Sequence, residues 1–298
     1  MTARPRTRRP RARASTALVL CVAVSAAWLL EQLVHDRPTY AARFGPSWLP
    51  LAAAALAATA IVLRWDGRPR LRRLRNALSW GGLLLMVWAA GGLPIDLLRV
   101  ASRVVPGGIM PHAIDWPGLA ARASACAAAV VLARLALESP QDETSLDVPA
   151  WYGYAAFVLA LPYPALKTCW ALGGTVGLRW SGAEGLTGSF ALWLPAVPWL
   201  LAAALSLLLV PRWRWLPRRL LLAAGWSATV VVAMVGPAAC WALASALVRG
   251  DPVSGGVATG TYAIVYGSWF LWAIAAAAAT RSYQLRGELP RSAVAAPA

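Results

Sequence analysis

Long apolar runs are the feature that most constrains this chain. Eight of them recur along the sequence, and a helix of about 20 such residues spans the roughly 30 Å hydrocarbon core of a bilayer. Charged residues make up 13% of the chain, where soluble domains carry roughly a quarter. The sequence therefore predicts a protein that is solvated mainly by lipid and excludes an ordinary water-soluble fold.

Helices are the expected form of these runs, because every backbone amide in lipid must find its partner within the segment. The runs lack the alternating pattern of barrel strands. The predicted fold class is all-α, a polytopic helix bundle with eight spans over residues 15–34, 47–63, 77–98, 117–137, 150–172, 190–210, 220–247 and 261–280.

Arginines set the expected orientation, because Lys and Arg of short loops stay in the cytoplasm. With the N-terminus inside, 20 of the 28 basic residues fall on the cytoplasmic side. Both termini are expected there, and the location is the cell membrane. The net charge of +16 does not indicate a nucleic-acid partner, because the arginines punctuate apolar runs. A cleaved signal over residues 1–34 is the alternative, although this apolar stretch exceeds the 7 to 15 residues of a signal.

The two halves of the chain share ordered motifs. The matches, at spacings of 145 or 146 residues, include Trp48–Pro50 with Trp193–Pro195, Arg72–Leu74 with Arg218–Leu220, Trp80 with Trp226, and Gly91 with Gly236. Alanine-rich and leucine-rich helices also align by chance, but the common order of the motifs favours a duplication. Four spans per repeat is an even number, so the two repeats would enter the membrane in the same sense.

The repeat defines the expected domain organisation. A basic tail (1–14) precedes the first four-span repeat (15–137), and a second repeat (150–281) precedes the C-terminal tail (282–298). Residues 138–149 contain four carboxylates and no basic side chain. This segment is expected to be a solvated linker.

Glycine and proline interrupt one span in each half. The candidate paired helix breaks are Gly91, Gly92 and Pro94 in the first repeat, with Gly236 and Pro237 in the second. Proline removes a backbone donor and kinks a helix, and matching breaks often line the site of a duplicated membrane protein. The alternative is that these residues serve only close helix packing.

Four ionisable residues lie near the expected outer ends of spans: Glu31, Asp96, Arg122 and Lys167. Charges inside a span are costly, so they are expected either to form a polar outer vestibule, in which a carboxylate pairs with Arg122 or Lys167, or to reach the headgroups separately. Asp96 also has an ion-pair partner three residues away in Arg99. Lys167, the only lysine, could be a base or a nucleophile, but an interfacial anchor is the simpler interpretation.

Metal and catalytic signatures are weak. Glu31 and His35 lie one helical turn apart, and His112 with Asp115 could add ligands, but the simpler interpretation is an ordinary solvated loop. The sequence contains no H-E-x-x-H, P-loop or G-x-S-x-G motif. One cysteine each falls in the first, fourth, fifth and seventh spans. We expect no cofactor, no metal and no enzymatic activity.

The run from Tyr163 to Leu178 is the most distinctive in the chain, with an aromatic helix that ends in Trp170-Ala171-Leu172-Gly173-Gly174. It resembles the signature of uncharacterised multi-pass membrane proteins of high-GC actinobacteria. The likeness covers residues 152–250 and implies a plasma-membrane location, with no chemistry attached. The matching position of the first half reads Trp28-Leu29-Leu30-Glu31-Gln32, which lacks the double glycine. Three glycines after Trp170 are expected to end the span in a tight turn.

Three classes of function therefore compete. The repeat and its paired breaks favour the binding or transport of a small amphiphilic molecule. Alanine-rich spans, which allow close helix contacts, favour a non-catalytic accessory subunit of a membrane complex. A membrane enzyme that acts on lipid, through Glu31, Lys167 or His112, comes third.

Overall fold

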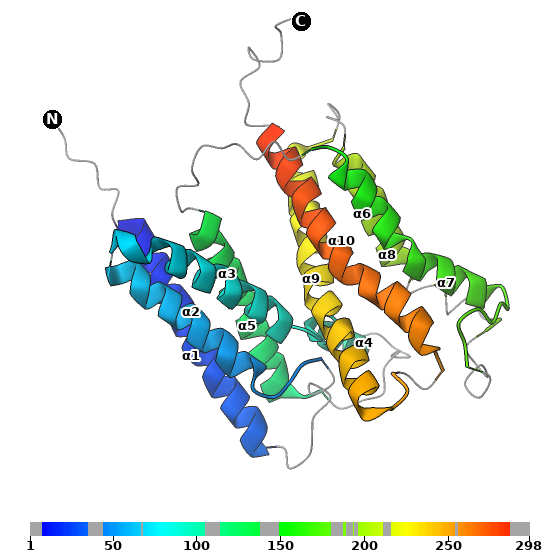
Figure 1. Cartoon of the computed structure of the whole chain (residues 1–298), viewed down its shortest axis with the longest axis horizontal. Coiled ribbons are helices and arrows are strands. Elements are labelled where there is room, and N and C mark those ends of the chain that lie inside the picture. The colour runs from blue at the N-terminus through cyan, green and yellow to red at the C-terminus, as the bar shows by residue number, and fades with distance from the viewer. Residues whose placement is uncertain are drawn as a thin grey trace, which may run out of the picture. The chain divides into compact units, whose positions relative to one another are not determined.

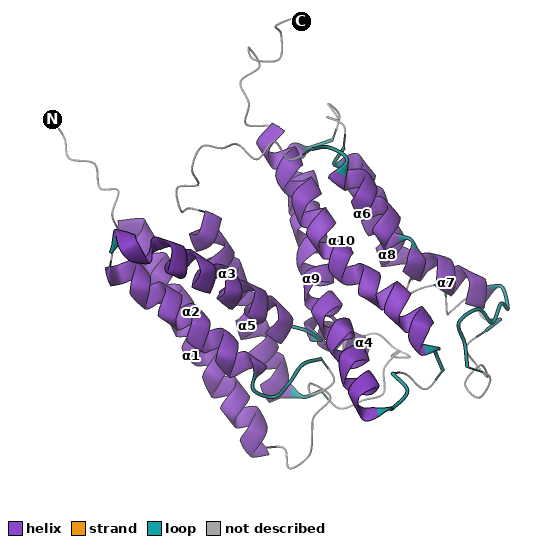
Figure 2. Ribbon diagram, viewed as in Figure 1, coloured by secondary structure: helices purple, strands orange, loops and turns teal. Residues whose placement is uncertain are grey.

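The chain forms two compact units, Met1–Thr144 and Ser145–Ala298. The computed structural model describes residues 8–34, 44–66, 68–104, 114–137, 149–179, 187–188, 193, 196–210, 216–253 and 256–286. The boundary between the units falls within the segment 138–149 expected to be a linker, of which only residue 149 is among those described. Helix dominates the described residues (Figure 2), and they contain no strand beyond an isolated bridge between Leu178 and Val257.

Unit 1 is a ring of helices around an alanine-rich core. Its elements are α1 (Arg8–Val34), α2 (Leu49–Asp66), the 3-10 turn η2 (Pro69–Leu71), α3 (Arg72–Ala89), α4 (Leu93–Val104) and α5 (Trp116–Leu137). Helix α1 packs on α2, α2 on α3, α3 on α5, and α5 on α1, while α4 contacts α5 (Figure 1). The buried side chains are mostly small, so the helix backbones can approach closely.

Unit 2 repeats this order of neighbours with a different core. Its elements are α6 (Tyr152–Ala160), α7 (Pro162–Ala171), α8 (Val197–Leu208), α9 (Arg218–Arg249) and α10 (Thr259–Arg286). Helix α6 packs on α8, α8 on α9, α9 on α10, and α10 on α6, while α7 contacts α8 and α10 (Figure 1). Aromatic side chains from α7, α8 and α10 fill much of its interior.

Glycines at two helix contacts explain how close the backbones come. A Cβ atom on Gly82 of α3 would lie 3.0 Å from the backbone nitrogen of Ala57 in α2, and one on Gly236 of α9 would lie 2.9 Å from the Cα of Phe270 in α10. Real Cβ atoms do not approach other atoms so closely without a shift of the backbone. Both hairpins therefore depend on the missing side chain.

Six helical segments are long and apolar enough to cross a membrane. They are Arg13–Val34, Leu49–Asp66, Arg72–Arg103, Trp116–Ala136, Arg218–Arg249 and Thr259–Arg286. Large apolar side chains are exposed along them, including Val19, Leu33, Leu84, Ile264 and Leu271, as expected for surfaces that face hydrocarbon. The coarse prediction of an all-helical membrane protein is thus supported by the described part of the chain.

Two of the eight predicted spans are helical but do not belong to this set. The segment predicted over 150–172 is divided at Leu161 into α6 and α7, of nine and ten residues. Pro162 and Pro164 lack the backbone donors that would continue the hydrogen-bond ladder, so a new helix starts at Pro162. The segment predicted over 190–210 contains α8, with 12 residues.

Candidate functional site

A buried network of charges connects α4 to α5 in unit 1. We call Asp96, Arg99, Asp115 and Arg122 the charge network. The Arg122 Nε donates to Asp96 Oδ2 at 2.5 Å, and its Nη2 donates to Asp115 Oδ2 at 3.3 Å. Arg99 Nη1 lies 3.7 Å from Asp96 Oδ1. Asp96 is only 1% exposed and Arg122 only 4%. Because water hardly reaches either charge, each is stabilised mainly by its oppositely charged partner.

Local turns place these side chains. The turn after α3 ends at Gly92, whose φ of 87° suits a residue without a Cβ, and its carbonyl accepts the backbone N–H of Asp96 in the first turn of α4. Asp115 Oδ1 accepts the backbone N–H of Gly118, and its backbone carbonyl accepts that of Leu119. The carboxylate therefore caps the start of α5 while it also holds Arg122.

The charge network contains two carboxylates and two guanidinium groups, so its formal charge is zero. Every carboxylate in it has a cationic partner within 4 Å. These ion pairs link α4 to α5 and to Asp115, which directly precedes α5, and the formal charges of the four side chains cancel. The role of the charge network is therefore to stabilise the packing of α4 against α5.

The four candidate vestibule residues are thus placed differently. Asp96 and Arg122 form the pair that the sequence suggested, together with Arg99. Glu31 is buried near the end of α1. Lys167 belongs to unit 2, where its ammonium lies over aromatic rings. The structure does not bring Lys167 to a carboxylate among the residues it describes.

The two candidate helix breaks also differ. Residues 90–92 separate α3 from α4, with Pro94 in the first turn of the new helix. Helix α9 instead runs unbroken from Arg218 to Arg249 with Pro237 inside it. Gly236 faces the backbone of α10 there, which corresponds to the close-packing alternative.

His35 and His112, the histidines considered as metal ligands, lie outside the described residues. In the part of the chain that is described, no group of three His, Cys, Asp or Glu residues could hold a metal ion. Asp115, the remaining loop candidate, is paired with Arg122.

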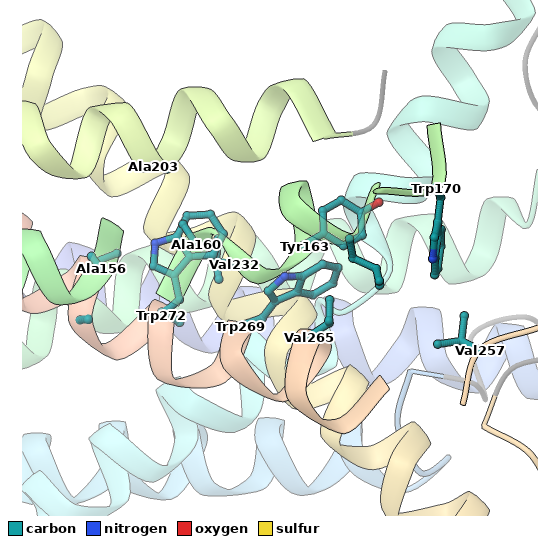
Figure 3. Packing of buried hydrophobic residues seen from close by; sticks show 14 residues of the cluster. Ala156, Ala160, Tyr163, Trp170, Ala203, Val232, Val257, Val265, Trp269 and Trp272 are labelled. Carbon is teal, nitrogen blue, oxygen red and sulfur yellow. The ribbon is translucent and has the colours of Figure 1, made fainter. Parts of the chain in front are cut away.

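The most unusual site lies in unit 2, where rings from three helices meet. We call Tyr163 of α7, Trp199 of α8, and Tyr266, Trp269 and Trp272 of α10 the aromatic cluster. The ring centroids of Tyr163 and Trp269 are 5.3 Å apart, those of Trp199 and Trp269 are 4.9 Å apart, and those of Trp199 and Trp272 are 5.5 Å apart. Figure 3 shows the rings of Tyr163, Trp269 and Trp272 beside small residues from α6 and α8.

Two donors inside the aromatic cluster have no acceptor in the described part of the chain. The indole nitrogens of Trp269 and Trp272 are buried and have no hydrogen-bond partner among the described residues. Other indoles of the same unit are satisfied, since Trp170 donates to the carbonyl of Val176 and Trp193 donates to the hydroxyl of Thr168, both at 2.9 Å. Buried indole N–H groups usually find a partner, so the two exceptions point to a missing acceptor.

Lys167 adjoins the aromatic cluster. Its Nζ lies 4.7 Å from the centroid of the Trp170 ring and 5.7 Å from that of Tyr163. Both are cation–π distances. The ammonium has no hydrogen bond or ion pair with any residue that the structure describes, although it offers three donors. It is partly exposed, so a ligand can reach it.

A short loop closes the end of α7 beside this site. Helix α7 ends at Ala171, and Gly173 and Gly177 have φ angles of 90° and 73°. The expected glycine turn is therefore present. Arg179 N donates to the carbonyl of Gly256, and Ala258 N donates to that of Gly177, so this loop pairs with the segment before α10.

Sequence reasoning missed the aromatic cluster because tryptophan is common at membrane interfaces and does not by itself indicate a buried site. One signal was present: Tyr262, Tyr266, Trp269 and Trp272 follow at spacings of four, three and three residues. That spacing places them along one face of a helix.

Comparison with protein-family models, with curated proteins and with solved structures finds no match to this chain. The candidate site is therefore interpreted from its own geometry.

Proposed function

We propose that this chain is a non-catalytic, multi-pass protein of the cell membrane that binds a small amphiphilic molecule in unit 2. One observation carries the proposal: the buried indole donors of Trp269 and Trp272, which lack acceptors among the described residues, lie in an aromatic cluster beside a lysine that also lacks one there. Binding sites for small molecules combine apolar and aromatic walls with a few placed polar groups. Unit 2 has both.

Unit 1 offers no comparable aromatic cluster among its described residues, because the ring pairs and the buried indole nitrogens without an acceptor lie in unit 2. Its charge network is balanced, and each carboxylate in it has a cationic partner. The proposal therefore assigns different roles to the units: unit 1 is held by ion pairs and small side chains, and unit 2 holds the ligand.

The proposal includes eight crossings in two parallel repeats, with both termini in the cytoplasm. The matching rings of helix neighbours support it, because α1, α2, α3 and α5 contact one another in the same cyclic order as α6, α8, α9 and α10. Charge also supports it. Arg64, Arg72 and Arg134 lie at the helix ends assigned to the cytoplasm in unit 1, and Arg218 and Arg286 lie at those of unit 2.

An accessory subunit remains the second candidate from the sequence. Its main argument was the alanine-rich composition of several spans, which allows close helix contacts. Many of these alanines are buried within the units, among them Ala57 of α2, Ala128 of α5 and Ala276 of α10. They already serve contacts inside the protein, which favours the ligand-binding proposal.

Photoaffinity labelling tests the proposal. The full chain is reconstituted in nanodiscs and exposed to a diazirine-bearing amphiphile, with the labelled peptides mapped by mass spectrometry. We expect saturable labelling of peptides from α7 and α10, competed by the unlabelled compound. Trp269→Leu should reduce this labelling several-fold, whereas Trp48→Leu, at an exposed position, should not.

Unsaturable labelling spread over all lipid-facing helices would contradict the proposal. Labelling of α7 and α10 that stays the same in Trp269→Leu would contradict the assigned site. Each variant is first checked for correct insertion and for a single peak in size-exclusion chromatography.

A further inference from the structure

Within the described part of the chain, the groups around the aromatic cluster that lack partners are all hydrogen-bond donors. They are the Lys167 ammonium and the indole N–H groups of Trp269 and Trp272. Neither an ammonium nor an indole can accept a hydrogen bond. A ligand that satisfies any one of them must supply an acceptor at that point.

Charge in unit 2 leads to the same conclusion. Among the residues that the structure describes there, Asp251 is the one carboxylate, and it lies 3.3 Å from Arg249. Among these described residues, Lys167 therefore has no anion to neutralise it. This contrasts with unit 1, where two aspartates balance Arg99 and Arg122.

Aromatic rings often bind a cationic ligand over their faces, but here a cationic side chain of the protein already lies over two of the rings. The ammonium of Lys167 already lies over Trp170 and Tyr163. A second cation would meet a like charge, which is unfavourable when both groups are partly removed from water. The site therefore disfavours quaternary ammonium compounds.

The headgroup and the apolar part of a ligand can both be placed next to the ring of Tyr163. Tyr163 has the Lys167 ammonium 5.7 Å from its centroid and the Trp269 ring at 5.3 Å. Lys167 is partly exposed, whereas Trp269 is 6% exposed. A ligand that runs from Lys167 towards Trp269 passes from a polar to an apolar environment.

We propose that the ligand of unit 2 is an anionic amphiphile whose headgroup oxygens bind Lys167. This inference rests on the proposed ligand-binding function and names its substrate class. The shared chemistry is a negatively charged oxygen headgroup on an aliphatic chain, as in a fatty-acid carboxylate or a phospholipid phosphate.

Competition binding with matched headgroups tests the inference. The full chain is placed in nanodiscs of phosphatidylcholine, and the displacement of radiolabelled palmitate is measured with palmitate, hexadecanol and hexadecyltrimethylammonium. We expect palmitate to compete at least tenfold better than the other two. A second arm replaces palmitate by phosphatidylglycerol, so the two arms distinguish a free carboxylate from a phospholipid phosphate.

Variants of the lysine give an independent readout. Lys167→Gln should weaken the preferred anion about tenfold and leave hexadecanol unchanged, whereas Lys167→Arg should retain most of the binding because it keeps the charge. Arg179→Gln is the matched control, an exposed basic residue of the same unit, and should change binding less than twofold.

The outcomes separate the two proposals. If no amphiphile of any headgroup binds saturably, the proposed function fails. If all three competitors act equally, or Lys167→Gln binds palmitate and phosphatidylglycerol as well as the unchanged chain does, amphiphile binding stands and the anionic class is wrong. The headgroup comparison in the unchanged chain decides the question even if Lys167→Gln does not fold.

Discussion

At the scale of single residues, the pairing of charges matters more than their number. Asp96 and Arg122 are almost completely buried, and the distance between Arg122 Nε and Asp96 Oδ2 is 2.5 Å. Removal of one partner leaves the other charge buried without compensation, which costs more than the pair contributes. The charge network is therefore the place where one substitution should have the largest effect.

We expect Asp96→Asn to lower the free energy of unfolding by about 3 to 5 kcal/mol, because Arg122 and Arg99 lose a carboxylate partner. The measurement is the stability of the full chain in mixed micelles, titrated with a denaturing detergent. Arg103→Gln, at an exposed position of the same helix, is the control and should change stability by less than about 0.5 kcal/mol. Equal stability of Asp96→Asn and the unchanged chain would contradict a structural role for the network.

The charge network could be predicted in part from the sequence, whereas the aromatic cluster could not. Asp96 and Arg122 were candidate partners because both are charges within apolar runs, where each needs a neutralising group. Lys167 met the same criterion, but no sequence rule distinguishes a lysine that needs a carboxylate from one over two rings. The aromatic cluster was missed because tryptophan is equally common at membrane interfaces.

At the scale of helices, glycine decides where two backbones touch. Gly82 faces the backbone of α2, whereas its neighbour Gly81 has open space around the position of a Cβ. In α9, Gly236 faces α10, and Gly267 of α10 is again open. The chain thus contains two matched pairs of sites for the same substitution.

We expect Gly82→Ala and Gly236→Ala to destabilise the protein by about 1 to 3 kcal/mol, the usual range for an overpacked contact. Gly81→Ala and Gly267→Ala should be neutral or slightly stabilising, since alanine favours helix. Thermal unfolding of the four variants in the same detergent measures the difference. A loss of stability at the two open sites as large as at the two contacts would contradict this assignment.

In each unit, an arginine near the end of one helix connects it to a neighbouring helix of the same unit. Arg64 of α2 donates to the carbonyl of Leu135 in α5 at 2.9 Å. In unit 2 the direction is reversed, because Arg286 of α10 donates to the carbonyls of Leu209 and Val210 that follow α8. Carbonyls at the end of a helix lack partners within it.

Arg286→Gln should therefore loosen the end of α8 and lower stability by about 2 kcal/mol, since hydrogen bonds from charged groups are stronger than average. Hydrogen exchange at residues 205–210 measures the local effect. Arg219→Gln, an exposed arginine of α9, is the control and should leave that exchange unchanged. Protection of 205–210 that is the same in both variants would show that Arg286 is dispensable.

Helix boundaries were predicted less well than helix existence. The apolar run 150–172 gave no reason to place a division at Leu161 other than Pro162 and Pro164, and prolines are tolerated within spans. The apolar run 190–210 contains a helix, as predicted, but this helix, α8, has only 12 residues. Apolar composition indicates burial in lipid or protein and does not by itself fix where a helix starts.

At the scale of the whole molecule, the number of crossings is the main open prediction. Six helical segments qualify as spans by length and composition, and eight crossings add α6 with α7 and α8. These alternatives differ in the side of the membrane on which residues 181–186 lie. With eight crossings they are outside, and with six they are inside, while both termini are cytoplasmic in either case.

A small epitope tag inserted in 181–186 should therefore be accessible to antibody on intact spheroplasts. A tag at 106–112 is the positive control, because both alternatives place it outside, and a tag at the C-terminus should become accessible only after permeabilisation. A tag in 181–186 that requires permeabilisation would support six crossings and reject the paired repeats.

Each unit closes its own circle of helix contacts, from α1 back to α5 and from α6 back to α10. A protease cut between them would sever the chain without opening either circle. We therefore expect that the two units, expressed from separate genes, would each insert into the membrane independently. The ligand should then bind only to the second unit.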